Sequence, residues 1–482
     1  MILRGAGIGR DVFDLRIEDG VIAEIGKIGE VGSSDHESLE LDGRWLSPGF
    51  WDNHVHFTQW ALQSQRLDVS SAGSAAETAR LIAAAIRSDS PTPFIAVGFR
   101  DGLWPDAPNL AVLDAVSTSP IVAVSGDLHA VWLNSAALKA YGHSESETGL
   151  LREDDAFRIL NLIDSLPDVQ LDAFADAAAR AAAARGVVGI VDYEMSWNPE
   201  VWARRQSAGA DSLRVEIGVY TQHLERAIAE GLRTGDRLGK LLTMGNFKIL
   251  IDGSLNTRTA YCWDEYAGAL GEFGMLTVEP ERLVELMRRA SAAGIEPAVH
   301  AIGDRANTIA LDAFEAVGCR GRIEHAQFLS DADLPRFAAL GVAASLQPDH
   351  AMDDRDVAEH YWPGRTSRAF PLRSLLDHGA TLLLGSDAPV SPLDPWRTLA
   401  AAVGRARDGR EPWHPEQAIG PADAIAASTR STIALGQPAD LVVVERDPLT
   451  ATPDELRDMA VFATLLGGRF THGPFVDGGD RT

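Results

Sequence analysis

Residues 172–194, DAFADAAARAAAARGVVGIVDYE, contain the pattern that decides the fold. The first part is rich in Ala and ends at Gly186, as helices often do, and the apolar, β-branched run that follows is typical of a buried strand. The same order recurs along the chain. Helix-like stretches lie at residues 75–89, 281–294 and 332–341, and strand-like runs at residues 213–221, 246–254, 296–304, 322–328, 342–350 and 381–390. Repeated βα units predict a parallel sheet, either open or closed as a barrel.

The two ends of the chain differ from this α/β part. Residues 1–48 and 430–482 contain short β-rich runs with turns between them, which predicts one small β-domain built from both ends. Residues 71–175 fit the alternation poorly, so we interpret them as an insertion that covers a site. Its His129 and Trp132 are candidates for that covering role, although buried aromatic side chains in an insertion more often form its own core.

Composition excludes several classes of protein. The chain has 43 Lys and Arg against 69 Asp and Glu, a formal net charge of −26. This acidity argues against binding to nucleic acid or to an anionic membrane surface, because phosphate groups attract clustered basic side chains. Apolar residues make up 45% of the chain and charged residues 23%, which excludes a mainly disordered protein. With only Cys262 and Cys319, a disulfide framework and a four-cysteine metal site are also excluded.

The sequence also bears on location and cofactor. The N-terminal residues contain no apolar segment typical of a signal peptide, and no apolar run approaches the length of about 18 residues that spans a membrane. We therefore predict a cytoplasmic protein that does not enter the membrane. No Gly-rich phosphate loop follows a strand, which disfavours the alternative of an open-sheet nucleotide enzyme.

The segment Asp52-Asn53-His54-Val55-His56 is the first candidate for chemistry. It follows a Pro-Gly turn on a predicted strand, where residues two apart point to the same side. Asp52, His54 and His56 therefore share a face, and two imidazoles on one face can bind one metal ion. A pair of core histidines with satisfied hydrogen bonds is the alternative.

The run Asn246–Asp252 contains a lysine on a predicted strand. Alternation places Phe247, Ile249 and Ile251 on one face and Lys248, Leu250 and Asp252 on the other. In a barrel the apolar face would meet the helices, so Lys248 and Asp252 would point inward. A buried ammonium group is costly without a partner. Either a salt bridge to Asp252 or a carbamate on the lysine, which could bridge two metal ions, would resolve this cost.

Three more candidates end predicted strands. His300 in AVHAIGD and His325 in IEHAQF each end an apolar strand, and Asp387 follows Leu382–Leu384 just past a Gly-Ser pair. A role for Asp387 as a helix N-cap is the alternative. Together with the earlier residues, these form a set of imidazole and carboxylate ligands without a thiolate. Such a set suits zinc or a similar first-row ion with an open catalytic position.

These motifs resemble the amidohydrolase superfamily of metal-dependent hydrolases. SPGFWDNHVHF at residues 47–57 is similar to the first-strand signature of that family. The YtcJ-like subgroup, which includes N-substituted formamide deformylases, is resembled by KILIDGSLNTRTA (248–260), VHAIGDRAN (299–307), RIEHAQF (322–328) and LGSDAPV (384–390). The resemblance covers nearly the whole chain, including GQPADLVVVERDP at residues 436–448 and the large insertion.

The resemblance implies an α/β fold, a (β/α)8 TIM barrel over residues 49–70 and 176–429. A small β-sandwich over residues 1–48 and 430–482 would accompany it, with the insertion 71–175 over the barrel mouth. His54, His56 and Asp387 would hold one divalent metal, zinc being the expected ion. His300 and His325 would hold a second metal where two are present, and Lys248, if N6-carboxylated, would bridge the two.

The implied function is hydrolysis of a C–N bond in a small-molecule amide, formamide or cyclic amide. Metal-activated water would attack the carbonyl carbon, and Asp387 would act as general base and then general acid. Candidates for substrate contact, or for support of the site, are Arg258, His350, Asp304, Gln327 and Trp132. Arg258 could instead pair with Asp264 or Glu265. The assembly, including a homo-oligomer, is left open.

Two further predictions concern residues near these motifs. By strand parity, Glu324 faces away from His325. Residues 351–370 read as a loop long enough to act as a lid.

Two other functions fit parts of the pattern. Heterocycle deaminases of the same fold usually carry a Glu three residues after the histidine of the fifth strand, where this chain has Gly303. A non-catalytic binding or regulatory protein that kept the fold would be expected to have broken ligand positions, and all six positions are intact here. Metal analysis and a screen of amides, esters and formamides would separate these functions.

Overall fold

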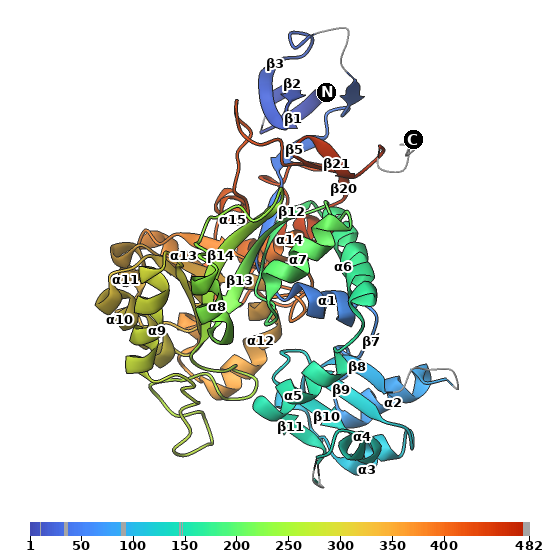
Figure 1. The fold of residues 1–482 in the computed structure, drawn as a ribbon, viewed down its shortest axis with the longest axis vertical. Helices are drawn as coiled ribbons and strands as arrows, with labels where there is room; N and C mark the ends of the chain where they lie inside the picture. Colours follow the sequence, from blue (N-terminus) through green and yellow to red (C-terminus); the bar gives the residue numbers. More distant parts are fainter. Residues whose placement is uncertain (10, 33–36, 88–92, 144–145, 147, 476–482) are drawn as a thin grey trace.

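The computed structural model describes residues 1–9, 11–32, 37–87, 93–143, 146 and 148–475. Its centre is an eight-stranded parallel sheet, and helices lie on the outside of it (Figure 1). The strands, in spatial order, are β6 (Phe50–Val55), β12 (Val187–Asp192), β13 (Arg214–Tyr220), β14 (Leu242–Leu250), β15 (Pro297–Ala301), β16 (Gly321–His325), β17 (Val342–Leu346) and β18 (Leu382–Leu384). A parallel bridge between Val55 and Ala388 joins β6 to the segment after β18. The predicted (β/α)8 barrel is therefore confirmed.

Helices follow the barrel strands. They are α1 (Phe57–Gln63), α6 (Asp168–Ala183), α7 (Asn198–Ser207), α8 (Leu224–Ala229), α9 (Pro280–Ala292), α10 (Asp304–Val317), α11 (Leu334–Leu340), α12 (Pro348–Tyr361), α13 (Leu372–Asp377), α14 (Pro395–Gly404) and α15 (Pro421–Ala427). Phe247, Ile249 and Ile251 of the β14 region belong to the apolar core that includes buried residues of these helices. Lys248 and Leu250 instead line a cavity, as alternation predicts.

A second sheet combines both ends of the chain, at the top of Figure 1. Its order is β21-β20-β19-β5-β1-β2-β3, with β4 paired to β1. The bounds are β1 (Ile2–Ile8), β2 (Asp11–Glu18), β3 (Val21–Lys27), β4 (Ser38–Glu40), β5 (Trp45–Pro48), β19 (Leu441–Val444), β20 (Val461–Leu466) and β21 (Arg469–His472), with helix α16 (Pro453–Arg457) between β19 and β20. This sheet has its own apolar core, and it confirms a small β-domain built from both ends.

The predicted insertion contains a third sheet, of order β11-β10-β9-β8-β7. Its strands are β7 (Leu67–Asp68), β8 (Phe94–Phe99), β9 (Ile121–Ser125), β10 (Ala130–Leu133) and β11 (Leu150–Arg152), and its helices are α2 (Ala75–Ala85), α3 (Leu110–Asp114), α4 (Ser135–Ala140) and α5 (Asp154–Ile163). Two separate apolar clusters pack within this part. The limits predicted for the three parts stay a prediction.

The predicted lid loop at residues 351–370 is wrong, because α12 occupies most of it. Pro348 starts this helix, where a missing backbone N–H costs nothing. The buried apolar residues of this helix are Pro348, Ala351, Met352 and Ala358, and its buried Asp349 pairs with Arg397 and Arg407. Few apolar positions therefore dock a helix that is largely polar. Among the described residues, no helix combines the length and apolarity needed to cross a bilayer.

Candidate active site

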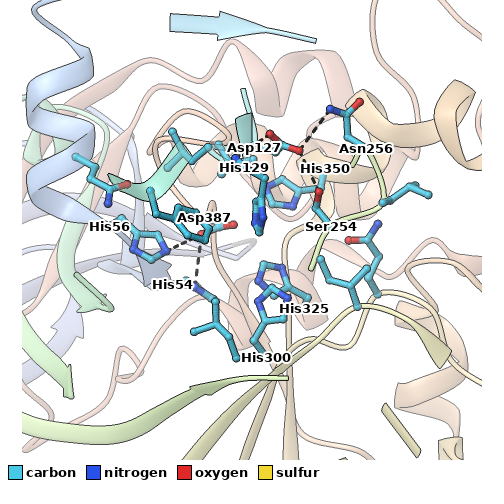
Figure 2. A pocket seen from close by; sticks show the side chains of 18 of the residues that line it. His54, His56, Asp127, His129, Ser254, Asn256, His300, His325, His350 and Asp387 are labelled. Carbon is cyan, nitrogen blue, oxygen red and sulfur yellow. Dashed lines mark hydrogen bonds and ion pairs between the residues drawn. The ribbon is translucent and has the colours of Figure 1, made fainter. Parts of the chain in front are cut away.

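A cavity opens at the carboxyl ends of the barrel strands, where barrels of this kind place their sites. All six predicted ligands line it, namely His54, His56, Lys248, His300, His325 and Asp387. Figure 2 shows that the labelled histidines and Asp387 gather around one space. The insertion supplies another wall, with Asp127, Leu128, His129, Phe157 and Leu160. Residues from both ends of the barrel sequence and from the insertion therefore share one site.

His54, His56 and Asp387 form the first group of potential ligands. The Nε2 atoms of His54 and His56 each lie 3.5 Å from Asp387 Oδ1, and one donor atom of each residue lies within 4.8 Å of the others. Backbone bonds align the two segments, since Asp387 N donates to His54 O at 2.8 Å. Asp387 itself has a φ of 56°, an unusual value that directs its side chain away from the strand pattern.

A second group contains His325, His350 and Asp387, whose donor atoms also lie within 4.8 Å of one another. His300 lies next to this group, with its ring centroid 4.4 Å from that of His325. Its Nε2 is 3.4 Å from Asp252 Oδ1. The structure thus brings His350, predicted only as a substrate contact, as close to Asp387 as a ligand would be.

Lys248 is almost fully buried beside the first group. Its Nζ lies 3.1 Å from His54 Nε2 and 4.5 Å from the centre of the Tyr193 ring. Burial lowers the pKa of this amine to about 8. Among the described residues no ion pair joins Lys248 to Asp252, because Asp252 instead accepts the backbone N–H groups of Tyr261 and Gly303 at 3.0 and 2.9 Å. A neutral amine is the form that can capture CO2, so the carbamate alternative remains a proposal.

Glu324 orients His54 from inside the barrel. Its Oε2 lies 2.7 Å from His54 Nδ1, and its Oε1 accepts the Tyr193 hydroxyl at 3.1 Å. Arg322 pairs with the same carboxylate. Because Nδ1 donates to a carboxylate, the lone pair of His54 resides on Nε2, which faces Asp387.

The charge states suit metal binding. Burial lowers the pKa of His56, His300 and His325 well below the usual value, that of His54 to about 3, and that of His350 to about 4. Burial also raises the pKa of Asp387 to about 7. Neutral imidazoles offer the lone pairs that a cation needs.

Unsatisfied polar atoms test the fit of a metal. His56 Nδ1, His300 Nε2, His325 Nδ1, His350 Nε2 and Asp387 Oδ1 are buried and lack a hydrogen-bond partner. Such atoms are rare in folded proteins because they lose hydration without compensation. A divalent cation among them would satisfy several at once, so the residues fit a metal of the zinc type.

A sequence-family model, described as the amidohydrolase family, matches residues 37–472 of the chain. The chain belongs to the amidohydrolase family. The chain is 28% identical to Protein LONG AFTER FAR-RED 3 of Arabidopsis thaliana, over 94% of this chain and 87% of that protein. It is 27% identical to putative amidohydrolase YtcJ of Bacillus subtilis, over 95% of each chain. It is also 27% identical to the N-substituted formamide deformylase of Arthrobacter pascens, over 94% of this chain and 93% of that protein. An uncharacterized metal-dependent hydrolase from Pyrococcus horikoshii has the same fold, with a TM-score of 0.79 at 24% identity over 94% of this chain and 99% of that one. The predicted resemblance is confirmed.

The other predicted residues of this amidohydrolase fall in different places. Gln327 and His350 line the cavity. Arg258 is exposed, 5.8 Å from the centre of the Tyr361 ring, and Asp264 pairs with Arg365 instead. Asp304 accepts a hydrogen bond from the backbone N–H of Trp263 at 3.0 Å, and it does not line the cavity. Trp132 is fully buried in the core of the insertion, which favours the alternative weighed for it.

Sequence reasoning missed residues that this amidohydrolase uses to build the site. Glu324 and Arg322 were predictable in part, because two charges on the inward face of β16 are unusual in a barrel strand. Parity separated Glu324 from His325, yet both reach the interior, because His325 has a φ of 73° that ends the alternation. Asp127 and Glu153 come from the insertion, and no local signal in the sequence connects them to the barrel.

Gly303 occupies a position where this amidohydrolase has no room for a side chain. A Cβ there would lie 2.1 Å from the carbonyl oxygen of Tyr261. We expect Gly303→Ala to lower the free energy of unfolding by about 1–3 kcal/mol through overpacking, measured by urea denaturation. Gly32→Ala is the control and should change little, because among the described residues other than its chain neighbours no atom lies within 4 Å of the added Cβ. Equal stability of both variants would show that the Tyr261 segment moves freely.

Proposed function

We propose that this amidohydrolase is a metal-dependent hydrolase that cleaves the C–N bond of a small amide, formamide or cyclic amide. The observation that carries the proposal is the group formed by His54, His56 and Asp387, with donor atoms within 4.8 Å of one another at the base of a largely apolar cavity. The 27% identity to an N-substituted formamide deformylase over most of both chains supports a formamide among the candidate substrates.

The proposed metal ligands are His54, His56 and Asp387 for one ion, and His300 and His325 for a second, with Lys248 between them if it is N6-carboxylated. The position of His350 makes it a further candidate for the second ion. Zinc is the proposed ion because the donors are imidazoles and a carboxylate. A bound divalent ion would polarise the substrate carbonyl and lower the pKa of water.

Asp387 is the proposed general acid and base. Its Oδ1 has no hydrogen-bond partner and faces the cavity, so it can accept a proton from attacking water and return it to the leaving nitrogen. Burial raises its pKa to about 7. The substrate would lie against Phe157, Leu160 and Leu250, with Gln327 and His350 as polar contacts.

A heterocycle deaminase is disfavoured by the space at Gly303. A glutamate proton shuttle at that position would need its Cβ within 2.1 Å of Tyr261 O. A purely regulatory role is disfavoured because the predicted ligands are intact and line one cavity. The net charge of −26 disfavours a nucleic-acid or anionic-membrane partner. The proposed location is the cytoplasm, and the proposed partners are small molecules.

Metal removal tests the proposal. Dialysis against a chelator should lower hydrolysis of N-butylformamide, acetanilide and a cyclic amide by at least about 100-fold, and zinc should restore it, because metal activation of water supplies much of the rate. Metal content is measured by elemental analysis in parallel. His54→Ala should lose metal and activity together, whereas Arg258→Ala, at an exposed site, should retain both. Zinc-loaded protein that hydrolyses none of the panel would contradict the proposal.

A further inference from the structure

A turn of the insertion, residues 125–129, reaches into the barrel cavity. It joins β9 to β10, and its Asp127, Leu128 and His129 line the cavity wall. Asp127 Oδ1 accepts hydrogen bonds from Ser125 Oγ at 2.6 Å and from the His129 N–H at 3.2 Å, which closes the turn on itself. Leu128 has a φ of 64°, so the turn is held in a conformation that few residues adopt freely.

The same turn is fastened to the barrel. Asp127 Oδ2 accepts the hydroxyl of Ser254 at 3.0 Å and the amide of Asn256 at 3.4 Å (Figure 2). Both partners belong to the loop after β14, the strand that carries Lys248. The position of His129 relative to the barrel site is therefore fixed by hydrogen bonds from the barrel itself.

The His129 ring is held by one nitrogen and free at the other. Its Nδ1 lies 2.9 Å from Glu153 Oε2, and Glu153 Oε1 accepts the Thr259 hydroxyl at 3.1 Å, a second link to the barrel loop. Within the described part of the chain, no hydrogen bond reaches His129 Nε2. Figure 2 shows the ring over the space that Asp387 and the other histidines enclose.

The surroundings favour a protonated ring. Burial disfavours the imidazolium, but the hydrogen bond to Glu153 and the charges of Asp127 and Glu153 oppose it, and the pKa of His129 is raised. A protonated His129 has a proton on Nε2 as well as on Nδ1, so its free edge is a charged donor. The other lining histidines have lowered pKa values, which makes His129 different from them.

We propose that His129 is a catalytic residue that donates a hydrogen bond from Nε2 to the carbonyl oxygen of the substrate, and that Glu153 is its positioning residue. This inference rests on the proposed hydrolysis of a C–N bond. When water adds to the carbonyl carbon, the carbonyl oxygen gains negative charge, and a donor fixed beforehand in a buried site stabilises that charge. Asp387 serves the proton of the water and the leaving nitrogen, so the two residues act on different atoms of the substrate.

His129→Gln tests the role of the charged donor. We expect kcat for the best-hydrolysed member of the panel to fall by about 100-fold, as for loss of one donor to a developing oxyanion, with KM and zinc content little changed. Arg158→Gln is the control, because it removes a charge from an exposed pair with Asp155 in the same insertion, outside the cavity lining. A wild-type kcat in His129→Gln would overturn the proposal.

A double-mutant cycle tests Glu153. Glu153→Gln alone should lower kcat by about 10-fold, and should lower it little further in the His129→Gln background, because residues that act as a unit are not additive. A change in folding alone would lower kcat equally in both backgrounds, and that result would overturn the positioning role. Thermal unfolding of each variant shows whether the insertion remains folded.

Binding of butyrate separates this inference from the proposed function. Calorimetry on the zinc-loaded protein should give a Kd at least about 10-fold weaker for His129→Gln than for the wild type, because a charged hydrogen bond to a carboxylate oxygen is lost. An unchanged Kd would overturn the role of His129 even if no amide is hydrolysed. Failure of the whole panel with normal butyrate discrimination would contradict only the proposed reaction.

Discussion

Replacing Asp387 with asparagine is expected to lower kcat by about 1,000-fold or more, because general acid–base catalysis by a positioned group contributes about 10²–10⁴-fold. Asparagine has nearly the same shape but cannot accept the proton from water. His54 and His56 remain in place, so zinc content should stay mostly intact. The measurement is kcat for the best-hydrolysed amide or formamide, with zinc determined on the same samples.

Asp394→Asn is a matched control for this change. Asp394 caps α14 by accepting a hydrogen bond from the backbone N–H of Trp396 at 3.1 Å. It also pairs with Arg185 at 2.9 Å, outside the cavity lining. The same carboxylate-to-amide change there should alter stability and leave kcat near the wild-type value. Near-normal turnover in Asp387→Asn would mean that another group moves the proton.

The parts of the fold that alternate regularly could be predicted from the sequence. In β14 and the residue after it, Phe247, Ile249 and Ile251 lie on one side and Lys248 and Leu250 on the other, which matches the core and the cavity of the structure. Strand periodicity works there because each residue stays extended and buried parallel strands offer two distinct environments. The pairing of the chain ends was predictable from the short β-rich runs and turns that both ends contain, and from the family resemblance.

The parts of the site that depend on non-extended residues or distant contacts could not be predicted from pattern. His325 and Asp387 have φ values of 73° and 56°, so the alternation of side chains along an extended strand does not predict where these two proposed metal ligands point. The contact of Glu153 with Thr259 joins residues 106 positions apart. Helix α12 was predicted as a loop because its polar composition hides the few apolar positions that dock it.

Glu324→Gln is expected to have the largest effect outside the ligands themselves. The carboxylate is fully buried and pairs with buried Arg322, so removing its charge leaves an uncompensated guanidinium and should lower the free energy of unfolding by about 3–5 kcal/mol. Glu324 Oε2 also lies 2.7 Å from His54 Nδ1 and fixes the tautomer of that ring. Zinc affinity should therefore fall by about 10–100-fold in Glu324→Gln. Urea denaturation of metal-free protein and competition with a zinc indicator measure the two effects separately.

Glu285→Gln is the control, since that carboxylate pairs with Arg282 on the surface, where ion pairs contribute little. The two readouts for Glu324→Gln also distinguish its two partners. Loss of stability with normal zinc affinity would mean that Glu324 serves only to pair with Arg322. Another group would then have to fix the tautomer of His54. Loss of zinc affinity beyond what the change in stability explains would instead show that the carboxylate acts on the metal through the imidazole, which is the role that the 2.7 Å contact supports.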